Sequence, residues 1–161
     1  MANIQTMLVM AGMVLLALIS LRFNTAVLQT SSAEIESKVA LTAFSLADDF
    51  IEEIKVKAFD EATLKFPTAA PSNLTPAGSL GLETFEPLSE ADDIDDYNNI
   101  TRVIDAPHAE AYNVRCTVQY VDGNNPINVS TVQTFYKRVN ITVTSPFLKN
   151  QIDLSFIFTL K

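Results

Sequence analysis

The densest group of side chains capable of chemistry is an acidic run between residues 92 and 96. Hard cations such as Ca²⁺ bind several carboxylate and carbonyl oxygens, so the run is a candidate calcium site. It lacks the glycine of an EF-hand loop, and the alternatives are a solvated acidic loop or a cap at a helix N-terminus. The four candidate metal ligands are Asp92, Asp93, Asp95 and Asp96.

For catalysis the sequence offers little. His108 is the only histidine and Cys116 the only cysteine, so a zinc site and an internal disulfide are not expected. No nucleophile elbow, phosphate loop or dinucleotide-binding glycine pattern is present. We expect an exposed loop histidine, a buried cysteine, no catalytic residues, no enzymatic activity and no cofactor apart from the calcium considered above.

The net charge of the chain limits the classes of partner that it can bind. The chain carries a formal charge of -8 with a pI near 4.5. Nucleic-acid binding needs clustered Lys and Arg, so no nucleic-acid partner is expected.

An apolar run, Met7 to Leu21, lies near the start of the chain with Gly12 and Ser20 as its only breaks, and the first charged residue is Arg22. About twenty apolar residues span a bilayer, and Ile4 and residues 26–28 extend the run if Arg22 snorkels. A cleaved secretory signal is the rival, but no basic residue precedes the run and no turn residue follows it. Either a basic leader has been removed before Met1, or Met1 is the initiator and orientation is set in another way.

The pattern continues as helix well beyond this run. Between Thr25 and Thr63 there is no proline or glycine, and apolar residues recur at helical spacing with charges on the other side. We therefore expect one helix from about residue 3 to about residue 60. A proline-rich connection follows at residues 67–90.

The last third of the chain alternates as β-strands do. Three strands are expected, over residues 112–120, 135–145 and 152–160, with a turn at DGNNP (122–126). The predicted fold is α+β: a long N-terminal helix, hydrophobic in its first half and amphipathic in its second, packed against a small C-terminal antiparallel sheet. The helix stripe expected on the sheet contains Phe44, Leu46, Phe50, Ile51 and Ile54. The sheet face expected beneath it contains Val139, Ile141, Val143, Ile152, Leu154, Phe156 and Phe158.

This organisation divides the chain into two parts. Residues 1–30 would form a helix for a membrane or a filament core. Residues 31–161 would form an extracytoplasmic domain that includes the amphipathic half of the helix and the sheet.

Three stretches sharpen a likeness to a known family. They are LADDFIEEIKVKAFDEAT (46–63), DDIDDYNNI (92–100) and FYKRVNITVTSP (135–146). In order and spacing they resemble type IV pilins and pseudopilins, most closely minor pilins of the mannose-sensitive haemagglutinin type. The similarity covers residues 46–160. The N-terminus departs from that family, because Gln5 stands where a glutamate is usual if Met1 is the first mature residue. Arg22 stands where a proline is common.

The resemblance implies a structural subunit of a type IV pilus-like or pseudopilus filament that assembles through its hydrophobic helix. Its partners would be copies of itself or other pilins, the pilus assembly machinery, and the membrane before assembly. It would be anchored in the inner membrane, then reside in an extracellular filament or a periplasmic pseudopilus. The alternative is a solitary membrane-anchored extracytoplasmic binding module. The expected assembly residues are Met1, Gln5, Met7, Leu8, Met10, Ala11, Gly12, Val14, Leu15, Leu18 and Leu21.

Overall fold

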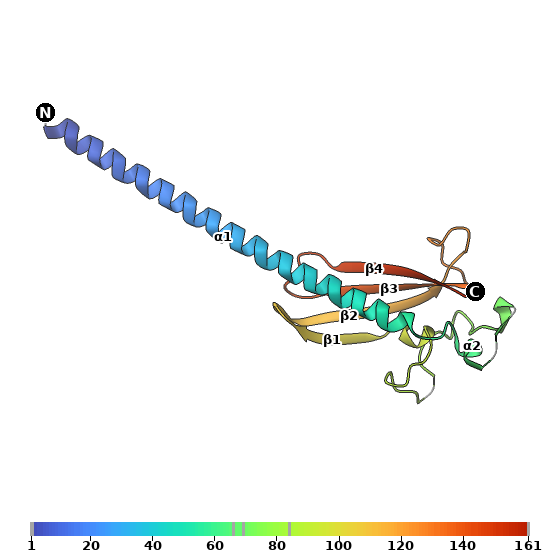
Figure 1. Ribbon diagram of the computed structural model, residues 1–161. Coiled ribbons are helices and arrows are strands. Elements are labelled where there is room, and N and C mark those ends of the chain that lie inside the picture. The colour runs from blue at the N-terminus through green and yellow to red at the C-terminus, as the bar shows by residue number, and fades with distance from the viewer. Residues whose placement is uncertain (1, 66, 69, 84, 161) are drawn as a thin grey trace. The chain divides into compact units, whose positions relative to one another are not determined.

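The computed structural model describes residues 2–65, 67–68, 70–83 and 85–160. The regular elements follow one another as a long helix, three short helical elements within an irregular connection, and a sheet (Figure 1). In chain order they are α1 (Ala2–Lys55), α2 (Glu61–Lys65), the 3₁₀ turns η1 (Pro71–Asn73) and η2 (Asp95–Tyr97), and the strands β1 (Thr101–Ala106), β2 (Ala109–Tyr120), β3 (Tyr136–Thr144) and β4 (Ile152–Thr159).

The chain divides into two compact units. The first ends at Lys38 and contains only the N-terminal part of α1. The second, Val39–Lys161, holds the rest of α1, the connection and the sheet, and is called the head below.

The sheet of the head is antiparallel and has four strands in the order β1-β2-β3-β4. The sequence predicted β2, β3 and β4 and missed β1. That strand is short and lies at the edge of the sheet, and none of its residues is fully buried. It therefore lacks the strong apolar alternation that marks the central strands.

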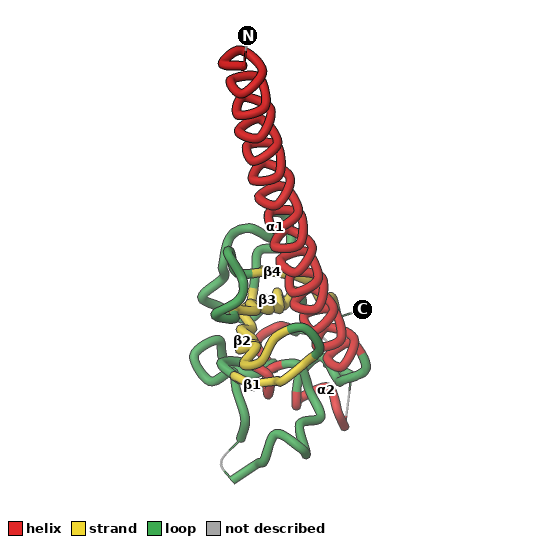
Figure 2. The backbone as a smooth tube through the Cα atoms, turned by 90° about the vertical axis from the view of Figure 1, so that its left-hand side faces the viewer, coloured by secondary structure: helices red, strands yellow, loops and turns green. Residues whose placement is uncertain are grey.

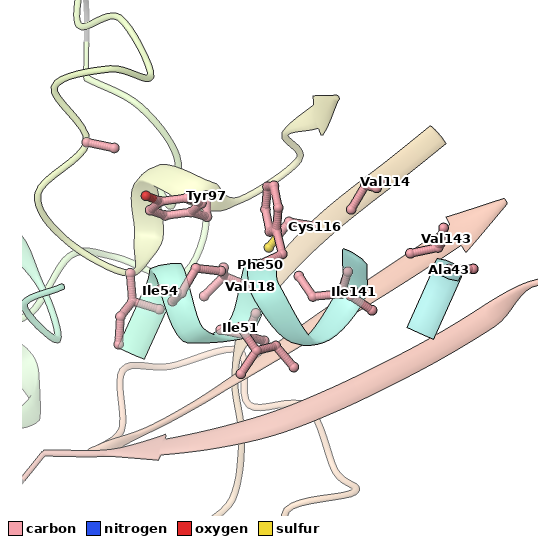
Figure 3. Close-up of a cluster of buried hydrophobic side chains, with 14 of the residues drawn as sticks. Ala43, Phe50, Ile51, Ile54, Tyr97, Val114, Cys116, Val118, Ile141 and Val143 are labelled. Atoms are coloured by element: carbon pink, nitrogen blue, oxygen red, sulfur yellow. The ribbon is translucent and has the colours of Figure 1, made fainter. Parts of the chain in front are cut away.

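The core of the head forms where the C-terminal part of α1 lies across one face of the sheet (Figures 1 and 2). The buried helix positions recur every three or four residues, which is the spacing of one helix face. Figure 3 shows this stripe meeting the inward side chains of β2 and β3. The helix contributes Val39, Ala43, Ala47, Phe50, Ile51 and Ile54, and the two strands contribute Tyr112, Val114, Cys116, Val118, Tyr120, Val139, Ile141 and Val143. The predicted α+β fold is confirmed.

Two residues expected in this core lie at its margin. Phe44 is 47% exposed and Phe156 is 39% exposed. Phe44 follows the buried Ala43 and so points away from the stripe. Phe156 pairs with Val139 and so lies on the inner face, but its strand, β4, is an edge strand with a neighbour on one side only.

Helix α1 ends at Lys55, earlier than the pattern predicted. The chain beyond it pairs with the acidic segment instead of continuing the helix. The N–H of Ala58 donates to the carbonyl of Asp92 at 3.0 Å, and the N–H of Ile94 donates to the carbonyl of Ala58 at 3.0 Å. A short bridge between residues distant in sequence thus replaces the last helical turn.

Candidate functional site

The expected assembly residues lie on the part of α1 that precedes the head. From Ile4 to Leu28 every large apolar side chain is at least half exposed, from 50% at Val27 to 73% at Met7 and Phe23. The exposed residues cover all sides of the helix, because neighbours such as Leu15 and Leu16 are exposed alike. Gln5, Ala11 and Gly12 lie on the same exposed helix, and Met1 lies outside the described residues.

An apolar surface of this extent is not stable in water. Monomeric soluble proteins rarely expose large contiguous apolar patches, and such patches mark contacts with membranes or other proteins. The helix contains a stretch with a mean hydropathy of 2.2 and none of that stretch is buried. The chain therefore has a long apolar N-terminal helix that could span a membrane.

Several hydroxyl groups along this helix find their hydrogen-bond partner within it. The hydroxyls of Thr25, Thr30 and Ser37 each donate to the carbonyl four residues earlier, at 2.8–2.9 Å. This pairing lets hydroxyl side chains enter an apolar environment without an unpaired donor.

The acidic run, the expected metal site, folds as a compact capping structure. Asp92 is exposed, whereas Asp93, Asp95 and Asp96 are buried. Asp93 Oδ1 accepts the N–H groups of Asp95 and Asp96, at 2.8 and 3.2 Å. Asp96 Oδ2 accepts the N–H groups of Asp92 and Asp93, at 3.0 and 3.2 Å. The run thus caps its own 3₁₀ turn, and its carboxylates serve separate roles.

The third buried carboxylate, Asp95, belongs to a charge network around Lys137. Lys137 is fully buried, and its Nζ donates to Asp95 Oδ1, to Asp60 Oδ2 at 2.9 Å and to the carbonyl of Phe59 at 2.7 Å. The ammonium also lies 5.3 Å from the centre of the Tyr120 ring. One cation from β3 therefore joins the segment that follows α1 to the acidic run.

The pKa values in this network follow from burial and charge. Burial alone would raise the pKa of Asp60, but its hydrogen bond to Lys137 and the Lys137 charge outweigh burial and lower it. Asp93 has no such cation in contact, and burial together with the charge of Asp95 raises its pKa to about 8. Its Oδ2 is buried with no hydrogen-bond partner among the described residues.

A second charged cluster ties α1 to β1. Both oxygens of Glu53 accept hydrogen bonds from the guanidinium of Arg102 at 2.9 Å, and the Tyr97 hydroxyl donates to Glu53 Oε1 at 2.9 Å. Arg102 also lies over the Phe50 ring, 4.5 Å from its centre. The hydrogen bond from Arg102 lowers the pKa of Glu53. This bidentate pair fixes the edge strand that the sequence pattern did not reveal.

The two residues considered for catalysis lie apart. His108 is exposed in the turn between β1 and β2, where its φ of 75° is in the left-handed region. Cys116 is buried and free, and burial raises the pKa of its thiol to about 12. Neither side chain is placed to act with the other.

Sequence reasoning named neither Lys137 nor Glu53 and Arg102 as a site. A signal for Lys137 was present, because strand alternation puts it on the same face as Val139 and Ile141. For Glu53 and Arg102 no comparable signal exists, since the sequence alone does not place β1 beside α1.

Comparison with protein-family models, curated proteins and solved structures found no match to this chain.

Proposed function

We propose that this chain is a structural subunit of a type IV pilus-like or pseudopilus filament, assembled through the apolar N-terminal part of α1. The observation that carries the proposal is the apolar surface between Ile4 and Leu28, where every large apolar side chain is at least half exposed, on a helix whose C-terminal part is built into a separate folded head. A subunit that passes from a membrane into a filament needs such a helix, because both environments bury it.

Burial among copies has a strong driving force in this segment. Fully burying a large aliphatic side chain contributes about 1.5–3 kcal/mol, and the segment presents a continuous series of them. Ala11, Gly12 and Ala17 are small residues that allow two helices to approach closely. Contacts between different faces of successive copies need not close into a ring, so they can propagate as a fibre.

The proposal includes the partners and location that follow from this role. The chain would lie in the inner membrane before assembly, contact copies of itself or other pilins and the assembly machinery, and then form part of an extracellular filament or a periplasmic pseudopilus. It acts through assembly and not through catalysis. The rival is a solitary membrane-anchored binding module, which uses the same helix as an anchor alone.

The variant Gly12→Leu separates the two roles. A Cβ added at Gly12 meets nothing within 4 Å, so the change leaves the isolated chain undisturbed. It also makes the segment more apolar, so membrane anchoring is retained. In a filament the larger side chain obstructs close helix contacts, whereas a solitary anchor has none to obstruct.

The test is made in cells that assemble the native protein. Electron microscopy with antibodies to the head examines material sheared from the surface, or the periplasm for a pseudopilus, and immunoblotting measures the membrane fraction. We expect filaments with the native chain, their loss in Gly12→Leu, and equal amounts of both proteins in membranes. The neighbouring volume-conserving change Met13→Leu is the control and should keep its filaments. A native protein found only in membranes would refute the proposal and support the anchored module.

A further inference from the structure

A group of three carboxylates lies at the junction of the irregular connection and the turn η2. Oxygens of Glu83, Glu86 and Asp96 all lie within 4.8 Å of one another. Glu83 is exposed, Glu86 is half-buried and Asp96 is buried. Among the ion pairs of the described residues none includes any of these three side chains.

The buried member has an oxygen without a partner. Asp96 is 1% exposed, and only its Oδ2 is used, by the N–H groups of Asp92 and Asp93. Its Oδ1 is buried and has no hydrogen-bond partner within the described part of the chain. A buried carboxyl oxygen without a hydrogen-bond partner costs free energy, and within a group of carboxylates such an oxygen is free to act as a cation ligand.

The backbone holds the two glutamates together despite their repulsion. The N–H of Glu86 donates to the carbonyl of Glu83 at 3.1 Å, and the N–H of Glu83 donates to Glu86 Oε2 at 3.3 Å. Phe85, inside this turn, has a φ of 74°, in the left-handed region.

We propose that Glu83, Glu86 and Asp96 bind one divalent cation, and that this cation is calcium. Ca²⁺ binds oxygens at roughly 2.3–2.6 Å, so the oxygens around one ion lie within about 5 Å of each other, which the group satisfies. Three carboxylates and no sulfur or nitrogen ligand suit a hard cation. Of the four aspartates considered from the sequence, only Asp96 belongs to this site.

The cation would fasten the irregular connection to the head. Glu83 and Glu86 lie in that connection, whereas Asp96 lies in η2, whose neighbour Tyr97 is in the hydrophobic core. Without a cation the three carboxylates repel one another, whereas a bound cation attracts all three. The site therefore makes the stability of the head depend on calcium, and it does so whether or not the chain forms filaments.

Calcium binding is measured on the full-length chain in detergent, freed of metal by chelation. Isothermal titration with calcium chloride gives the affinity, and near-ultraviolet circular dichroism of the tyrosines gives the melting temperature. We expect one site with a dissociation constant of roughly 10⁻⁴–10⁻³ M and weaker binding of magnesium. The melting temperature should rise by about 5–10 °C when calcium reaches about a hundred times that constant.

Glu86→Gln and Glu83→Gln are the test variants. Each should weaken calcium binding at least about tenfold, since carboxylate count sets calcium affinity. The stability difference between each variant and the native chain should also change sign with calcium. Without calcium each variant should be at least as stable as the native chain, because a repulsion between carboxylates is removed. With calcium each variant should be less stable than the native chain. The control is Glu90→Gln, an exposed residue of the same connection outside the group.

The outcomes are decisive in either direction. Absence of calcium binding up to 10 mM would overturn the proposal. If Glu90→Gln weakened calcium binding as much as the two test variants, the proposal would also be overturned, since calcium affinity would then depend on the overall charge of the chain. If Glu86→Gln fails to fold, the exposed Glu83→Gln supplies the same comparison.

Discussion

Replacing Lys137 by methionine tests whether the buried charge network holds the head together. Methionine keeps the length and apolar stem of the lysine but removes its charge and its donors. The change leaves Asp60 and Asp95 buried without their common cation and removes the donor from the Phe59 carbonyl. Breaking a buried ion pair on one side costs about 3–5 kcal/mol.

The structure indicates which carboxylate responds. Asp60 keeps other donors, namely the N–H groups of Ala62 and Thr75 and the hydroxyl of Tyr120. Asp95 accepts from Lys137 through its side chain, so in the variant its carboxylate is left buried without a charged donor. Leaving a buried carboxylate without its cation costs about 3–4 kcal/mol, and the unpaired Phe59 carbonyl adds about 1 kcal/mol. The expected loss at pH 7 is therefore about 4–5 kcal/mol.

This mechanism requires the loss to depend on pH. Burial would raise the pKa of Asp60 and Lys137 lowers it, so removing Lys137 raises that pKa and the loss should be larger at pH 7 than at pH 5. For a unit the size of the head, the pH 7 loss lowers the melting temperature by roughly 15–20 °C, and the loss at pH 5 lowers it by less. The assay is thermal unfolding of the full-length chain in detergent, followed by near-ultraviolet circular dichroism at both pH values.

Two further variants make the result interpretable. Lys137→Met/Asp95→Asn removes the stranded charge and should recover more than about 2 kcal/mol relative to Lys137→Met alone. The exposed Lys149→Met carries the same chemical change on the surface and should stay within about 0.5 kcal/mol of the native chain. An equal loss at pH 5 and pH 7, or a double variant no more stable than the single one, would refute the reasoning.

Three other predictions concern the core. Phe50→Ala should lower the free energy of unfolding by about 3–5 kcal/mol, because Phe50 is only 3% exposed. Phe156→Ala should lower it clearly less, because Phe156 is 39% exposed. Equal melting temperatures of the two variants would contradict this packing. Asp93→Asn should be nearly neutral at pH 4 and stabilising at pH 9. Because the pKa of Asp93 is raised in the folded state, its protonated carboxyl contributes stability that is fully present below the unfolded pKa near 4 and is lost as pH rises through about 8. Asparagine does not titrate and loses nothing over this range. A melting temperature difference that does not change with pH would count against this prediction. Cys116 should resist maleimide at pH 8 until the head unfolds, because it is buried and its thiol pKa is about 12; mass spectrometry of the native chain showing rapid labelling would disprove that.

The long helix and central strands could be predicted because their signals are local. The stripe that contains Phe50 and Ile54 repeats at the helical period, and β2 and β3 alternate strictly. Exposure of Phe44 and Phe156 could not be predicted as directly. It depends on which part of a broad stripe faces the sheet and on which strand lies at the edge, and both are set by tertiary packing.

The candidate sites were only partly predictable for the same reason. The acidic run was visible, and calcium was a reasonable inference from its carboxylates. Within the run, however, Asp93 Oδ1 and Asp96 Oδ2 accept hydrogen bonds from backbone N–H groups of the same run. These two oxygens are therefore occupied and less suited to bind a metal. The two glutamates of the proposed calcium site precede that run by several residues, and only the fold brings them to Asp96.

Lys137 and the early end of α1 have one physical explanation. Strand alternation places a lysine on the apolar face of β3, and a buried ammonium is tolerated only beside negative partners. Asp60 and Asp95 come from segments distant in sequence, and they reach the ammonium because the chain leaves the helix after Lys55 and pairs Ala58 with the acidic run. Continuing the helix to residue 60, as its sequence pattern favours, would break that pairing and displace Asp60 from Lys137. The length of the helix is therefore set by a charge on a strand about eighty residues later.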